Sequence, residues 1–252
     1  MTIAVFGDAH AHADAFDAVL AAAEACGADE LWSLGDMVGR GPDPDHVVRL
    51  TRERCAVALM GNHDYGATGS AEPERFGAAG SAAVRSIELA RDRMPGELVD
   101  WMRSRKPAAR RGDVQCWHGG PRNAVHQYVG PSNAAECLAL QRGSLGLVAH
   151  THLAAAWEQT PRGAARAARI RVGEPLDLAD GKWLLNPGAV GAPIPGFRSW
   201  WDALDGEAAD GAFWLLLDLE RRIAIWQRAP YDPAPARARV RALDLDDVGT
   251  VR

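Results

Sequence analysis

Short apolar runs alternate with amphipathic helical patterns along the first part of the chain. Residues 3–6 form an apolar run closed by Gly7, which predicts a buried strand followed by a tight turn. Residues 14–26 then carry apolar side chains at helical spacing, and Gly27 is placed to end that helix. The chain therefore begins with a strand and a helix.

The same alternation continues through two more strands. Residues 30–34 and 56–60 are apolar runs that each end at a glycine, and a helix between them begins near Pro42. The order strand, helix, strand, helix, strand predicts an α/β fold built on a layered sheet. Its crossovers should be right-handed if the strands pair in parallel.

A helical segment interrupts this alternation. Residues 88–106 have helical character that is broken at Pro95-Gly96, which predicts two helices over one end of the sheet. They belong to a helical insertion at about residues 66–110, which we expect to overhang the functional site. Because the chain shows no internal repeat and no low-complexity linker, we expect one domain spanning residues 1–252.

The later part of the chain returns to strands and closes with a helix. Its last three strand patterns are expected to form a second, largely antiparallel sheet. Val240 and Leu243 of the final helix are expected to pack back on the body. The predicted elements are strands at 114–117 and 145–149, a helix at 132–141, a loop or hairpin at 164–181, strands at 182–185, 212–218 and 222–228, and a helix at 232–243.

The composition is that of an ordinary globular protein with an acidic balance. Hydrophobic residues make up 47% and charged residues 24% of the 252, and the formal net charge is -5. This charge gives no general attraction to a nucleic-acid duplex or an anionic membrane, so a phosphorylated ligand needs local cations. The four scattered cysteines and the lack of a long apolar stretch predict free thiols in a cytoplasmic protein without a membrane span.

Side chains that can bind metals follow five of the predicted strands. Each occurrence alone is weak evidence, because Gly-Asp is a common turn and a lone histidine is usually a surface or core residue. The joint pattern is difficult to obtain by accident, since the carboxyl ends of strands in an α/β fold converge on one edge. The set is Asp8, His10, Asp36, Asn62, His63, His118, His150 and His152.

The chemistry of this set favours divalent metals. Carboxylate, imidazole and amide oxygen suit ions such as Mn, Fe or Zn, and nothing indicates a thiolate zinc site. His150 and His152 lie two apart on an extended segment, so both can approach one centre. Asp36 is central in the set and could bridge two ions about 3.5–4 Å apart, an arrangement suited to in-line displacement at phosphorus.

These blocks resemble the signature of the calcineurin-like metallophosphoesterases. The motifs VGRGPDP, HGGPRNAV, NPGAVG and APYDP extend the resemblance to the bacterial branch that includes diadenosine tetraphosphatase and small protein phosphatases. The resemblance implies a four-layer α/β/β/α sandwich of two facing mixed sheets, with the metals at the carboxyl edge of the strands. It also implies two divalent ions, most plausibly Mn, with Fe, Zn, Ni or Co as alternatives.

The resemblance also implies a role for each residue of the set. His63 would not bind a metal but would protonate the leaving oxygen or stabilise the transition state. Asp64 would either orient His63 or cap the next turn. The first metal would be held by Asp8, His10, Asp36 and His152, and the second by Asp36, Asn62, His118 and His150.

The chain departs from the family pattern at several positions. Ala11-His12 replaces the usual Gly-Asn, so His12 either substitutes for that asparagine or faces solvent, and Ala149 replaces a glycine before the His-x-His pair. Gly39 stands where protein phosphatases of the family carry an aspartate that pairs with the catalytic histidine. Arg40 and Arg122 are candidate clamps for phosphate oxygens, and the alternative is that both are ordinary surface arginines.

These observations predict an enzyme that hydrolyses phosphate esters with a metal-activated hydroxide. We expect a phosphodiesterase or phosphatase acting on small molecules or nucleotides. The alternatives are a dinucleoside polyphosphate hydrolase, a protein phosphatase, or a metal-binding scaffold without catalysis. Trp200-Trp201 could stack on a base, form a homodimer contact or fill their own loop.

Overall fold

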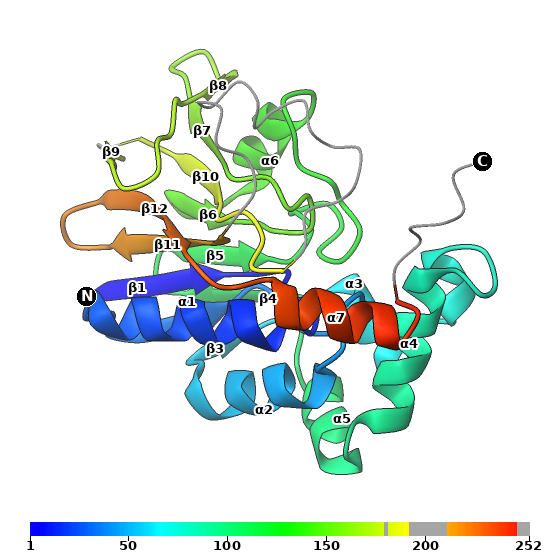
Figure 1. Cartoon of the computed structure of the whole chain (residues 1–252). Coiled ribbons are helices and arrows are strands. Elements are labelled where there is room, and N and C mark those ends of the chain that lie inside the picture. Colours follow the sequence, from blue (N-terminus) through cyan, green and yellow to red (C-terminus); the bar gives the residue numbers. More distant parts are fainter. Residues whose placement is uncertain (179–180, 192–210, 246–252) are drawn as a thin grey trace, which may run out of the picture.

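The computed structural model describes residues 1–178, 181–191 and 211–245 as two facing six-stranded sheets with helices on their outer sides (Figure 1). The first sheet has the order β3-β2-β1-β11-β12-β9, and the second has the order β4-β5-β6-β10-β7-β8. The first sheet consists of β1 (Thr2–Phe6), β2 (Glu30–Ser33), β3 (Val57–Ala58), β9 (Pro175–Asp177), β11 (Ala212–Asp218) and β12 (Ile223–Ala229). The second consists of β4 (Ala108–Arg111), β5 (Val114–Trp117), β6 (Leu145–Leu147), β7 (Ala155–Gln159), β8 (Ala165–Ala167) and β10 (Trp183–Asn186).

Helices cover the outer face of each sheet. In Figure 1, α1, α2 and α7 lie on the side of the first sheet, and α6 lies against the second. Among the described residues, every helix is too short or too polar to cross a bilayer. The helices are α1 (Ala13–Ala25), α2 (Pro44–Arg54), α3 (Asn62–Ala67), the 3-10 helix η1 (Pro73–Phe76), α4 (Ala82–Arg93), α5 (Gly96–Arg103), α6 (Ala134–Leu140) and α7 (Ala234–Ala242).

The alternation of β1 explains how this sandwich is packed. Ile3 and Val5 point into the core between the two sheets, whereas Ala4 and Phe6 point into the core beneath the helices. All four side chains are fully buried. A strand with apolar residues on both faces has to lie inside a layered structure, so the uninterrupted apolar run is explained by burial on both sides. The expected α/β fold with two mixed sheets is confirmed.

The expected membership of the second sheet was partly wrong. Only β10 of the last three strand patterns lies there, parallel to β6 and antiparallel to β7. Strands β11 and β12 belong to the first sheet, where β11 pairs antiparallel with β1. The alternation of apolar residues specifies the faces of a strand but not its partner, so this pairing could not be derived locally. Strand β7 was not predicted at all.

The segment at 164–181 and the helical insertion also differ in detail from expectation. The segment contains β8 and β9, which lie in different sheets rather than in one hairpin. The two helices broken at Pro95 are present as α4 and α5, with η1 before them. In the final helix Ala236 is buried, whereas Val240 and Leu243 are only partly buried. Trp200-Trp201 lie outside the described residues.

Trp226 of β12 joins the two sheets. Its ring is 1% exposed in the inter-sheet core, and its indole N–H donates to the carbonyl of Asn186 on β10 at 2.8 Å. We predict that Trp226→Ala lowers the free energy of unfolding by about 3–5 kcal/mol, because it leaves a cavity and an unpaired carbonyl. Urea unfolding measures this. Val172→Ala, at a side chain 52% exposed, is the control and should change it by less than about 0.5 kcal/mol; equal effects would contradict the prediction.

Candidate metal centre

The loops that follow the strands are held in an unusual backbone conformation. Asp8, His10, Asp36, His150 and His152 all have φ between 50° and 65°. This left-handed region is costly for residues other than glycine, and such outliers concentrate at functional sites. Five candidate ligands in this conformation indicate that the surrounding structure fixes where their side chains point.

Backbone hydrogen bonds tie the loop after β1 to the loop after β2. The N–H of Asp8 donates to the carbonyl of Gly35 at 2.9 Å, and the N–H of His10 donates to the carbonyl of Asp36 at 2.9 Å. Gly61 lets the third loop come close, because a Cβ there would lie 2.0 Å from Oδ1 of Asp36. The strand order therefore brings three loops into direct contact at one edge.

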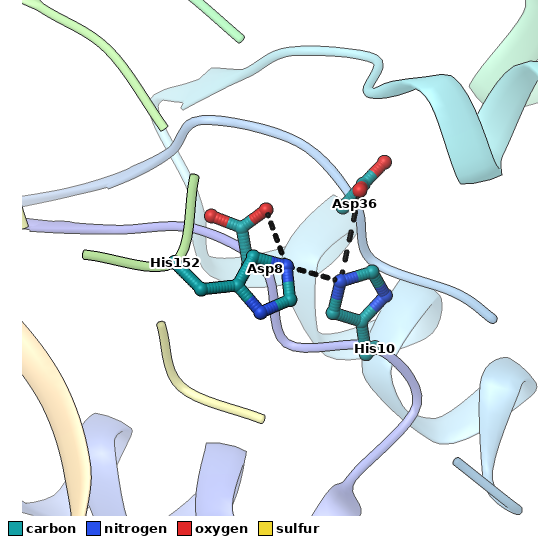
Figure 2. A group of neighbouring side chains, drawn as sticks. All are labelled: Asp8, His10, Asp36 and His152. Carbon is teal, nitrogen blue, oxygen red and sulfur yellow. Dashed lines mark hydrogen bonds and ion pairs between the residues drawn. The ribbon is translucent and has the colours of Figure 1, made fainter. Parts of the chain in front are cut away.

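One group of four buried side chains can hold a metal ion. Each of its residues offers a ligand atom within 4.8 Å of the others. Figure 2 shows the two imidazoles between the two carboxylates, and the Nε2 atoms of His10 and His152 are 2.9 Å apart. Within the described part of the chain, Oδ1 of Asp8 is buried without a hydrogen-bond partner, although it lies 3.4 Å from Nε2 of His152. The group is Asp8, His10, Asp36 and His152.

A second group shares one carboxylate with the first. Asp36, His118 and His150 also offer ligand atoms within 4.8 Å of one another. Nε2 of His118 lies 3.6 Å from Oδ2 of Asp36 and 3.2 Å from Oδ1 of Asn62. Two neighbouring groups of oxygen and nitrogen donors that share a carboxylate fit two divalent ions. The seven expected ligands are therefore gathered in one place.

The backbone also fixes the orientation of two imidazoles. Nδ1 of His10 lies 3.1 Å from the carbonyl of Val38, and Nδ1 of His118 lies 2.9 Å from the carbonyl of Leu34. A carbonyl can only accept, so each Nδ1 carries the hydrogen and each Nε2 directs its lone pair to the centre. This tautomer is the one that a metal requires.

Burial opposes charge throughout the cluster. It raises the pKa of Asp36 to about 7 and lowers the pKa of His118 to about 4 and that of His150 to about 3. It also raises the pKa of Asp8 and lowers the pKa of His10. Neutral imidazoles are ready to bind a cation, whereas the carboxyl groups must first release their protons.

His63 lies beside the metal groups but belongs to neither. Its ring contacts His10 at a centroid distance of 4.7 Å and Phe76 of η1 at 4.9 Å. Its Nδ1 is buried without a hydrogen-bond partner among the described residues. Burial, and after it the charge of Arg40, lowers the pKa of His63. Nδ1 lies against the backbone of Gly39, where an added Cβ would be 2.3 Å from it, and it is shielded from solvent.

Asp64 makes contacts that correspond to the capping alternative. Its carboxylate accepts from the backbone N–H of Gly61 at 2.8 Å, which caps the start of α3. It also accepts from the N–H groups of Asp36, Met37 and Val38 at 2.9, 2.9 and 3.2 Å. Asp64 thereby holds the backbone of the bridging residue in place.

The two candidate arginines differ in their surroundings. Arg40 is partly buried, and its buried Nε has no hydrogen-bond partner among the described residues. Its charge lowers the pKa of both Asp36 and His63, so the guanidinium lies near the centre. Arg122 is exposed and pairs with Glu136 of α6. A role for Arg122 in phosphate binding stays a prediction.

Gly39 explains why an aspartate is absent beside His63. A Cβ at this position would lie 2.3 Å from Nδ1 of His63, and its φ is 84°. Any side chain would therefore collide with the imidazole in its present position. The chain replaces an acidic partner for His63 with close packing of the ring on the backbone.

Sequence reasoning missed two side chains around the centre, Tyr128 and Phe76, and left two alternatives open for His12. His12 is 9% exposed, and burial lowers its pKa to about 4, so the solvent-facing alternative was wrong. Tyr128 stacks on His150 with ring centroids 4.0 Å apart, and Phe76 covers His63. These contacts join segments far apart in the chain, and no local pattern in the sequence marks them.

Comparisons with known proteins agree with this geometry. The calcineurin-like phosphoesterase family matches residues 1–154. A metallophosphoesterase from Sphaerobacter thermophilus has a similar crystal structure, with a TM-score of 0.81 and 26% identity over 98% of this chain and 96% of that one.

Two relatives match parts of the chain in sequence. A protein from Methanocaldococcus jannaschii that has not been characterized is 27% identical over 206 residues, which are 78% of this chain and 79% of that protein. The symmetrical bis(5'-nucleosyl)-tetraphosphatase of Delftia acidovorans is 33% identical over 144 residues, or 56% of this chain. The match spans about half, 49%, of that enzyme.

The raised pKa of Asp36 predicts how metal binding depends on pH. The carboxyl group has a pKa of about 7 and must lose its proton to bind a cation. Manganese affinity should therefore change little from about pH 8 to pH 7 and fall below pH 7 by about tenfold per pH unit for each proton released, down to about pH 5.5. His118, with a pKa of about 4, does not limit binding in this range. Calorimetry measures the affinity, and a constant value across the range would contradict the prediction.

Proposed function

This chain belongs to the calcineurin-like phosphoesterase family. From that premise we propose that the site formed by the two groups of metal-binding side chains hydrolyses phosphate esters of small molecules or nucleotides. The observation that carries the proposal is the Asp36 carboxylate shared by both groups. When bound, two divalent ions supply Lewis-acid charge and lower the pKa of water, which provides the nucleophile. Manganese suits the mixed oxygen and nitrogen donors.

Two residues of the chain would bind the phosphate and protonate the leaving group. The guanidinium of Arg40 holds phosphate oxygens, because it has unsatisfied donor capacity beside the centre. His63 donates a proton to the leaving oxygen. A bound phosphate brings negative charge next to its ring and favours the protonated imidazole, which offsets the lowering of its pKa by burial.

Nucleotides are the substrate class that the relatives favour. Dinucleoside polyphosphate hydrolysis is supported by the similarity to the symmetrical bis(5'-nucleosyl)-tetraphosphatase of Delftia acidovorans. Because the match covers 49% of that enzyme, we propose this activity for the chain and do not infer it from the similarity alone. Gly39 disfavours the protein phosphatase alternative, because no side chain fits between its backbone and His63. A cytoplasmic location and a homodimer stay predictions from the sequence.

A comparison of two substitutions tests the assigned roles. His118→Ala removes a ligand, so both bound manganese and turnover should be lost. His63→Asn should keep both metals and lower turnover by about 10²–10⁴-fold, the usual contribution of a positioned acid. Metal analysis and hydrolysis of p-nitrophenyl phosphate and bis-p-nitrophenyl phosphate measure the two effects.

The controls separate the proposal from its alternatives. Thermal unfolding of each variant shows whether the fold is kept. Loss of metals from His63→Asn would show that this histidine is a ligand. Hydrolysis of neither compound by metal-loaded protein would favour the scaffold without catalysis. Faster hydrolysis of the diester than of the monoester would assign the chain as a phosphodiesterase.

A further inference from the structure

Tyr128 presents an exposed aromatic ring at the edge of the metal centre. One face of the ring covers the imidazole of His150, with centroids 4.0 Å apart and an interplanar angle of 21°. The residue is nevertheless 60% exposed, so its other face is open to solvent. In the described part of the chain, the other large apolar side chains with high exposure are aliphatic, namely Met1, Leu140 and Val172.

The backbone on either side of this ring is firmly anchored. The side-chain amide of Asn133 donates to the carbonyl of Tyr128 at 2.8 Å, and its Oδ1 accepts from the N–H of Gly130 at 2.9 Å. Val129 is 3% exposed in the core beneath α6. The loop therefore holds the ring in place although the ring itself is largely in water. A rigid, preformed aromatic surface reduces the entropy lost on binding a ligand.

We infer that Tyr128 determines specificity by stacking on the base of a nucleotide whose phosphate lies at the metal centre. The inference rests on the phosphate-ester hydrolysis proposed above. A base stacked on the outer face of Tyr128 would be separated from the imidazole of His150 by the tyrosine ring alone. A nucleotide has a ribose between its phosphate and its base, so it can reach both positions at once. Stacking on one ring accepts any base.

A simpler role for Tyr128 would be to shield His150 from water. The two roles predict different results for a matched pair of ligands, adenosine 5'-monophosphate and ribose 5-phosphate, which differ only in the base. Stacking strengthens binding of the nucleotide alone, whereas shielding affects both ligands equally. The ratio of their dissociation constants therefore isolates the contribution of the base.

The test uses two variants of Tyr128 in manganese-loaded protein. Tyr128→Phe keeps the ring, and Tyr128→Leu keeps apolar cover over His150 without a ring. The native protein should bind the nucleotide about 5- to 100-fold more tightly than the sugar phosphate. The phenylalanine variant should keep this ratio, and the leucine variant should bring it close to one. Calorimetry measures the constants, or KM replaces them if a ligand is turned over.

Several outcomes would overturn the inference. It is wrong if the native ratio is already close to one, or if the leucine variant keeps the native ratio. A leucine variant that binds both ligands as the native protein does would assign Tyr128 to shielding instead, because leucine keeps the cover over His150. The proposed function is tested by a different measurement, the hydrolysis of the p-nitrophenyl esters. Protein that hydrolyses neither ester can still show the predicted ratio of dissociation constants, so the two proposals can fail separately.

Discussion

The carboxylate of Asp36 is the point on which the arrangement of the site depends. It lies within ligand distance of both groups of donors, so every other ligand has to be brought to it. Three N–H groups of the segment that carries it, and that of Gly61, donate to the carboxylate of Asp64 and fix this segment in place. The absence of a side chain at Gly61 leaves the space that it occupies. The packing of the two sheets places the remaining loops around this one group.

This arrangement is costly in the absence of a cation. Several ligands adopt left-handed backbone conformations, and burial keeps the pKa of Asp36 near 7 and that of His118 near 4. Without a cation, folding therefore buries several ionisable groups close together in an environment that disfavours their charged forms. A divalent ion held by these residues would offset this cost, because it would accept the imidazole lone pairs and neutralise the carboxylates. Metal affinity and the stability of the fold are linked for this reason.

The sequence predicted which side chains gather at the centre better than which strands pair. Ligand-type residues directly after apolar runs identified the edge of the sheet, because strand ends in α/β folds meet there. The pairing of Val5 with Leu215 could not be found, since alternation gives the faces of a strand but not its neighbour. The burial of His12 and the stacking of Tyr128 likewise arise from contacts between distant segments. Such contacts have no periodicity that a single sequence displays.

The close contact at Gly39 has a consequence for how active sites of this family can diverge. An acidic residue at this position cannot be introduced while His63 keeps its place, because the first carbon of any side chain would overlap the imidazole. An aspartate at this position would require the side chain of His63 or the backbone of Gly39 to move. A single substitution to aspartate at this position would therefore displace His63, and a second change would be needed to accommodate both side chains.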